Sequence, residues 1–173
     1  MEHLTNHEKH RCLSLLVMNN AGVLSRISGL FSRRGYNIDA LTVGTTEDEK
    51  ISRITITVSG DDKIIEQIIK QLYKLIDVIK IVELEKGQAI RRELVYIKVK
   101  ADDNTRSNIV NICNLFRANV VDVAPESLIL EVVGPASKVD AFFEMIKPFG
   151  IIEFVRSGAT GLQRGKKSVH ESK

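Results

Sequence analysis

The stretch RCLSLLVMNNAGVLSRISGLFSRRGYNIDALTVGT, residues 11–45, combines three patterns that together indicate a fold. Residues 11–18 form a β-like apolar run that ends at an Asn-Asn-Ala-Gly turn. The next apolar positions recur at helical spacing up to Gly35, where the helix is expected to end: Val23, Leu24, Ile27, Leu30 and Phe31. Residues 37–45 then read as a second strand. The stretch therefore predicts a strand, a helix and a strand.

The following residues extend this order. Residues 51–60 alternate between apolar and polar side chains, which is typical of a half-buried antiparallel strand. Asp61 or Asp62 is suited to cap a second helix. Its buried stripe is expected to comprise Ile64, Ile65, Ile68, Ile69, Leu72 and Leu75. With a strand over 77–85, the order is β-α-β-β-α-β.

The same order recurs after a polar connector. Strands are expected over 94–101, 119–124, 127–134 and 150–156, with one helix around Ile109–Phe116 and another opened by Pro135. We therefore expect an α+β protein of two tandem ferredoxin-like βαββαβ modules. Two helices should cover one face of each sheet. The other face and an edge strand stay open, which favours pairing with a second copy.

The domain boundaries follow from these patterns. We expect a flexible N-terminal arm at 1–10, a first module at 11–85, a linker at 86–93 and a second module with a basic tail at 94–173. The formal charge is +3, but residues 156–173 hold five Lys/Arg and one acid, so the excess belongs to the tail. Because aromatic residues are few and Trp is absent, nucleic-acid binding is not expected.

The cysteines and the distribution of apolar residues indicate the cellular compartment and its redox state. Cys12 and Cys113 are far apart and suit buried reduced thiols. The N-terminus is too polar for a signal peptide, and no apolar stretch has the length of a membrane span. We expect a cytoplasmic protein that does not contact a membrane.

The sequence has few candidates for catalytic or metal-binding side chains. His3, His7 and His10 have helical spacing but lie in a polar arm, so a solvated arm is favoured over a metal site. The paired acids in 60–63 and 101–104 each precede a helix, where capping explains them. No nucleophile elbow or phosphate-loop pattern is present. We therefore expect neither a catalytic residue nor a metal ligand.

The turn before the first helix is the remaining candidate. Gly22 lies at the first helical turn, where free N–H groups and the helix dipole attract an anion. Asn19 and Asn20 can cap the helix or turn their amides toward a ligand. Asn37 lies at the far end of the helix and reaches the same ligand only if the fold or a second copy brings it there. From spacing alone, an ordinary capped turn with a left-handed glycine is favoured.

Three segments of the chain are similar to a known family. NNAGVLSRISGLFSRRGYNIDALTVGTTEDEKISRITI (19–56), KQLYKLIDVIKI (70–81) and RSGATGLQRG (156–165) resemble the regulatory, or small, subunit of acetolactate synthase, also called acetohydroxyacid synthase. The resemblance covers about residues 11–166. Residues from about 11 to 85 resemble an ACT domain, a module that binds small effectors, usually amino acids.

The resemblance implies a site shared by two ACT domains that pair edge to edge. Valine is the typical effector, with leucine or isoleucine in some members. The implied effector-binding residues come from the turn of one copy and the second strand of its partner: Asn19, Asn20, Ala21, Gly22, Val23 and Leu24, with Asn37 and Ile38. Before Gly22 this chain has the residues Met-Asn-Asn-Ala (18–21), where relatives often carry an acid and a serine, so the exact effector stays open.

The implied function is regulatory, in branched-chain amino acid biosynthesis. The chain would activate the large catalytic subunit and confer feedback inhibition by valine. The large subunit would carry thiamine diphosphate, Mg²⁺ and FAD and condense pyruvate with pyruvate or 2-oxobutyrate, while this chain would bind no cofactor. An alternative is a free-standing ACT-type sensor that acts on a different partner. A small ferredoxin-like enzyme is a third possibility, against which the lack of a polar constellation argues.

Overall fold

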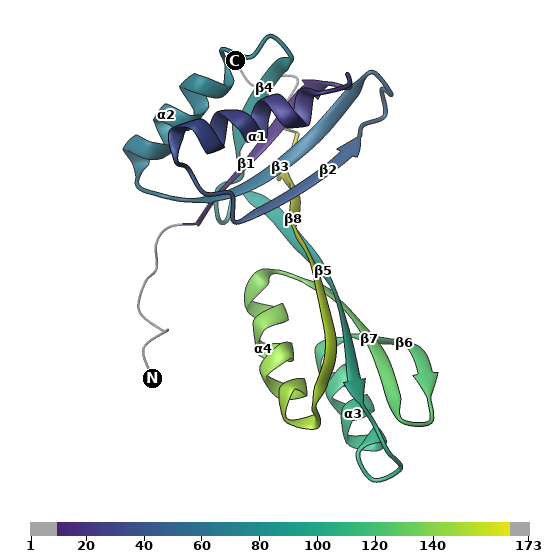
Figure 1. Cartoon of the computed structure of the whole chain (residues 1–173). Coiled ribbons are helices and arrows are strands. Elements are labelled where there is room, and N and C mark those ends of the chain that lie inside the picture. The colour runs from purple at the N-terminus through teal and green to yellow at the C-terminus, as the bar shows by residue number, and fades with distance from the viewer. Residues whose placement is uncertain (1–9, 167–173) are drawn as a thin grey trace. The chain divides into compact units, whose positions relative to one another are not determined.

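The computed structural model describes residues 10–166, which divide into two compact units (Figure 1). Within this range, the first unit contains residues 10–90 together with 159–166, and the second contains Arg91–Gly158. Residues 1–9 of the arm expected at 1–10, with His3 and His7, and the end of the tail at 167–173, with His170, lie outside the described residues. His10, expected in the arm, begins the first strand instead.

The first unit is a four-stranded antiparallel sheet with two helices on one face (Figure 1). Its elements are β1 (His10–Met18), α1 (Val23–Arg34), β2 (Ala40–Thr45), β3 (Ile51–Ser59), α2 (Asp62–Leu72) and β4 (Val78–Glu83). The strand order is β2-β3-β1-β4. This order makes β2 an edge strand that pairs with β3 alone in the sheet.

The second unit repeats the arrangement. Its elements are β5 (Ala89–Lys100), α3 (Arg106–Phe116), β6 (Asn119–Ala124), β7 (Ser127–Gly134), α4 (Ala136–Ile146), the short 3₁₀ helix η1 (Lys147–Phe149) and β8 (Ile151–Gln163). The strand order is β6-β7-β5-β8, and β5 and β8 carry residues of both units. The expected α+β fold of two βαββαβ modules is confirmed.

Alternating side chains build the core of the first unit. In the β1–β3 ladder, Leu15 lies opposite Ile54 and Leu13 opposite Ile56, and all four are essentially inaccessible to water. Phe31 of α1 packs onto them with 1% of its surface exposed. Each such buried side chain contributes about 1.5–3 kcal/mol. The alternation of apolar side chains along the strands therefore determines which face of the sheet the helices cover.

The predicted helix ends are also observed. Gly35 adopts a left-handed conformation with φ of 69°, and its N–H reaches the carbonyl oxygens of Phe31 and Ser32. At the start of α2, Asp61 Oδ1 accepts a hydrogen bond of 2.8 Å from the N–H of Ile64, so the capping role predicted for Asp61 is confirmed.

Some boundaries differ from the prediction. Residues 89–93 were expected within a polar linker, but they begin β5, because β8 continues to Gln163 and gives them a neighbouring strand. The N–H of Arg164 still reaches the carbonyl oxygen of Gln88 over 2.9 Å. Residues 159–166 were expected in the second module and instead belong to the first unit.

The second face of the first sheet is covered, although we expected it to be open. Ser14 and Thr55 lie opposite each other on this face and are 0% and 2% exposed. The hydroxyl of the neighbouring Thr42 donates to the carbonyl oxygen of Ala159 over 2.8 Å. The end of β8 thus occupies a face that the sequence pattern left unassigned.

Candidate effector site

Gly22 sits at the junction between β1 and α1. Its φ of 83° and ψ of −3° are left-handed, a conformation that glycine adopts without steric cost. The strand end before it is held by two backbone hydrogen bonds, from Met18 N–H to the Asp77 carbonyl over 2.8 Å and from Asn19 N–H to the Lys50 carbonyl over 2.7 Å. The turn that presents Gly22 is therefore fixed to the residues that directly precede β3 and β4.

The start of α1 has no cap. The side-chain amide of Asn19 donates to the carbonyl oxygen of Glu49 over 2.8 Å, and no side chain accepts from the helix start. Among residues 10–166, none accepts a hydrogen bond from the N–H groups of Gly22, Leu24 or Ser25. The first turn also contains no acidic residue. Exposed, uncompensated N–H groups at a helix start attract an anion.

A guanidinium group lies beside these N–H groups. A Cβ placed on Gly22 would lie 3.1 Å from Nη1 of Arg26. Nε of Arg26 donates to Oδ2 of Asp77 over 2.8 Å, and Asp77 is only 8% exposed. Sequence reasoning missed both residues. The spacing of four positions from Gly22 to Arg26 was a usable signal, whereas nothing in the sequence linked Arg26 to Asp77.

The other predicted residues of the turn differ in exposure. Asn20 and Ala21 are exposed, and Leu24 exposes 43% of its surface next to the helix start. Val23 is 5% exposed and belongs to the core. Leu24, not Val23, is therefore the apolar side chain that this turn presents to solvent.

Asn37 and Ile38 lie at the opposite end of α1. The 12 residues of α1 separate them from Gly22 by about 18 Å along the helix axis. Asn37 Nδ2 donates to Asp39 Oδ1 over 2.8 Å, and Ile38 packs partly against the core. One copy of the chain thus brings residues 19–24 together but leaves Asn37 and Ile38 apart from them.

Asp39 organises the loop that carries Asn37. Partial burial acts to raise its pKa, but hydrogen bonds with Ser59, His10 and Asn37 outweigh burial and lower the pKa of Asp39 below its ordinary value. Ser59 Oγ lies 2.7 Å and His10 Nδ1 lies 3.1 Å from Asp39 Oδ2. The carboxylate thereby fixes the orientation of the Asn37 amide.

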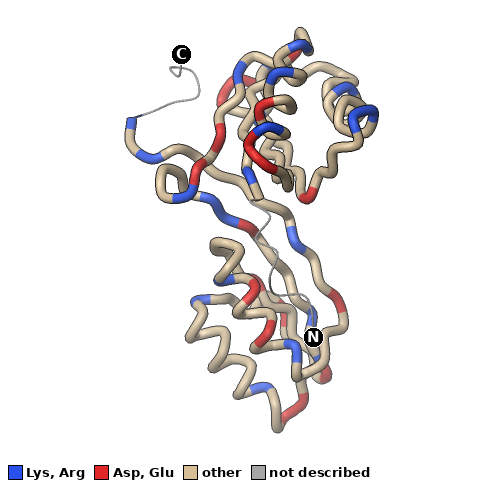
Figure 2. Tube along the Cα trace, turned by 90° about the vertical axis from the view of Figure 1, so that its left-hand side faces the viewer, with Lys and Arg blue, Asp and Glu red and all other residues tan. Residues whose placement is uncertain are grey.

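The described part of the chain also contains potential metal ligands, thiols and charged side chains. Residues 10–166 contain no group of three His, Cys, Asp or Glu side chains placed to hold a metal ion. Cys12 and Cys113 are both buried and are not joined by a disulfide, and burial raises the pKa of Cys113 to about 11. Basic and acidic residues are interspersed along the described trace (Figure 2). None of the described helices is long and apolar enough to cross a membrane.

Comparison with known proteins gives the class of this fold and site. A family profile described as "AHAS small subunit-like ACT domain" matches residues 13–80, so the first unit is built on an ACT domain. A profile described as "Small subunit of acetolactate synthase" matches residues 92–165.

Individual relatives agree over nearly the whole chain. The acetolactate synthase small subunit of Mycobacterium bovis is 50% identical over 165 residues, covering 95% of this chain and 98% of the relative. A probable acetolactate synthase small subunit of Archaeoglobus fulgidus is 49% identical, with 90% and 97% covered. The crystal structure of the Thermotoga maritima small subunit is 37% identical and superposes with a TM-score of 0.85, covering 92% of this chain and 99% of that one. The chain belongs to the family of acetolactate synthase small subunits.

Proposed function

We propose that this chain is the non-catalytic regulatory subunit of an acetolactate synthase, which activates a large catalytic subunit and makes it sensitive to valine. Relatives at about 50% identity carry the name small subunit, which supports a large-subunit partner. The uncapped start of α1 at Gly22, with Arg26 beside it, is the observation that carries the effector site.

The free N–H groups of Gly22, Leu24 and Ser25 would bind the carboxylate of the amino acid, assisted by the Arg26 guanidinium. Asn19 and Asn37 each use Nδ2 as a donor, and no described residue donates to their Oδ1 atoms. These amide oxygens are therefore available to accept from the ammonium group.

The effector site would be completed by a second copy of the chain. About 18 Å of helix separates Gly22 from Asn37, which is more than one amino acid can span. The edge strand β2 begins just after Asn37 and has an unpaired side that a second copy could join. A two-fold arrangement would place the Gly22 turn of one copy near Asn37 and Ile38 of the other, with Leu24 and Ile38 facing a branched side chain.

The chemistry would belong to the partner. Thiamine diphosphate, Mg²⁺ and FAD would be held by the large subunit, and this chain would act on its activity through contacts. Valine would need to favour one state of the holoenzyme, with a coupling of about 1–3 kcal/mol.

Reconstitution with the cognate large subunit tests this function. The activity of the large subunit is measured with increasing amounts of this chain, with and without valine, leucine or isoleucine. Calorimetric titration of the same amino acids into the chain alone gives the affinity. We expect activation by the chain, inhibition by valine and heat of valine binding. A chain that binds valine but does not alter acetolactate synthesis would refute the regulatory assignment.

A further inference from the structure

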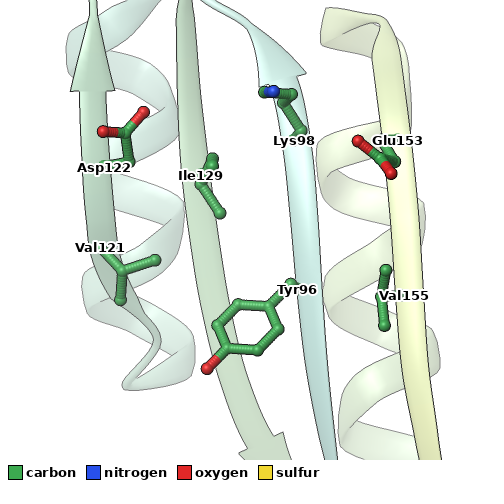
Figure 3. Close-up of a pocket in the computed structure, with 7 residues that line it drawn as sticks. All are labelled: Tyr96, Lys98, Val121, Asp122, Ile129, Glu153 and Val155. Carbon is green, nitrogen blue, oxygen red and sulfur yellow. The ribbon is translucent and has the colours of Figure 1, made fainter.

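The second sheet has a face without helices that carries apolar side chains. Helices α3 and α4 pack on one face, where Val95, Ile97 and Val99 are fully buried. The opposite face has a hollow of about 370 Å³ whose apolar lining is Tyr96, Val121, Ile129 and Val155 (Figure 3). Tyr96, Val121 and Val155 expose 38%, 50% and 53% of their surfaces. A contiguous patch of exposed apolar side chains often marks an interaction site.

Three charged side chains, Lys98, Asp122 and Glu153, lie on the same face. Asp122 lies opposite Ile129, and Ile129 lies opposite Lys98. Glu153 of β8 borders the hollow on the far side of Lys98 (Figure 3). Within residues 10–166, the side chains of Asp122, Lys98 and Glu153 have no ion pair or hydrogen bond. An apolar centre with charged groups at its margin is the usual anatomy of a protein interface.

The helix-free face of the first sheet provides a comparison. There the end of β8 covers the sheet, and Ser14 and Thr55 are almost completely buried. One charged cluster elsewhere in the second unit is paired: Arg156 Nε donates to Glu93 over 2.7 Å and Arg156 Nη1 to Asp140 over 2.9 Å. The helix-free face of the second sheet is thus exposed, whereas the corresponding face of the first sheet is covered.

The charge balance of this face indicates its partner. Asp122, Glu131 and Glu153 outnumber Lys98, so two copies packed face to face would oppose acids to acids. A partner that offers apolar groups with Lys or Arg around them fits better. We propose that this face of the second sheet binds the large catalytic subunit. The proposal rests on the proposed function, which supplies that partner.

Two kinds of variant test the face against matched controls. Tyr96→Ala removes the aromatic ring from the hollow, and Leu115→Ala removes an apolar side chain that is 81% exposed on α3. The double charge reversal Asp122→Lys with Glu153→Lys is compared with Asp103→Lys, an exposed position outside the face. Binding to the cognate large subunit is measured by sedimentation velocity and by titration of the activation.

We expect Tyr96→Ala and the double reversal each to weaken binding at least about 10-fold, because central aromatic residues carry much of the binding energy and reversed charges would oppose like charges across the interface. Leu115→Ala and Asp103→Lys should bind like the unchanged chain. Unaltered affinity of both face variants would overturn the proposal. So would a change in the self-association of the chain alone with unaltered affinity for the large subunit.

The folding of each variant is checked by circular dichroism and thermal unfolding. The charge reversals lie at exposed positions that have no ion-pair partner within residues 10–166, so they still test the proposal if Tyr96→Ala is unstable. Failure of the unchanged chain to bind the large subunit would instead refute the proposed function, and the proposed face with it.

Discussion

Nε of Arg26 donates to Oδ2 of the buried Asp77 over 2.8 Å, and this ion pair keeps the guanidinium beside Gly22. The Nη groups of Arg26 make no hydrogen bond with any residue in the described range, so they are available to an anion at the helix start. Since the neighbouring N–H groups of α1 are also free, a single carboxylate can be met by backbone and side-chain donors together.

Arg26→Gln should therefore weaken valine binding about 10-fold, because a hydrogen bond to a charged group contributes about 1.5–3 kcal/mol. Calorimetric titration measures the effect. Arg33→Gln, in the last turn of the same helix, removes an equal charge far from Gly22 and should leave the affinity unchanged. Equal affinities for Arg26→Gln and the unchanged chain would exclude Arg26 from the site.

Gly22→Asp should abolish the valine response and leave activation intact, because it places a carboxylate where that of the effector would lie. Gly22→Ala is the matched control. It introduces the same Cβ near Arg26 and the same left-handed strain, about 1 kcal/mol, without the charge. We expect valine inhibition of the reconstituted enzyme to persist with Gly22→Ala, at reduced affinity. Normal valine inhibition with Gly22→Asp would contradict the site.

Asp39 should make the stability of the chain depend on pH. Its pKa is lower in the folded state than in the unfolded chain, where it is about 3.9. The stabilisation is thus fully present above about pH 5 and is lost as the pH falls through the folded pKa. Urea unfolding should show Asp39→Asn less stable than the unchanged chain at pH 7, by an amount that shrinks below about pH 4. Asp103→Asn, an exposed control, should show no such trend, and a pH-independent difference for Asp39→Asn would be evidence against the mechanism.

Asp61→Ala should lower the free energy of unfolding by about 1 kcal/mol, since it removes the only side-chain cap observed at the start of α2. Lys63→Ala changes an exposed residue of the same turn and should have little effect. Denaturant unfolding monitored by circular dichroism compares the two. If both variants unfold alike, the cap does not contribute as the geometry suggests.

The fold was largely predictable because its signals are local. Alternation on β3 and the apolar stripe of α2 reflect the burial of one side of each element, and Gly35 and Asp61 mark helix ends by their own backbone and side-chain chemistry. The cover on the first sheet was not predictable. It depends on a hydrogen bond between Thr42 and Ala159, residues 117 positions apart, and no local pattern records such a pairing.

The same distinction applies to the candidate site. Gly22 was recognisable from its turn, whereas the Arg26–Asp77 pair depends on the return of β4 beside β1. The family resemblance also placed Val23 among the effector-binding residues, whereas its side chain is 5% exposed and packs in the core. Of Val23 and Leu24, only Leu24 is exposed at the surface of the turn.

The central claim is that one effector site is built from two copies of the chain, and a mixing experiment tests it most directly. Gly22→Asp blocks the carboxylate end, and Asn37→Lys places a positive charge at the ammonium end, so neither variant alone should bind valine. In a shared site, a dimer of one Gly22→Asp copy and one Asn37→Lys copy has one site with both ends unchanged. After dissociation and reassociation in equal amounts, half of the dimers are mixed, and calorimetry should show about a quarter of the unchanged chain's valine capacity. Absence of any recovered binding, with mixed dimers verified by mass spectrometry, would contradict a site shared between copies.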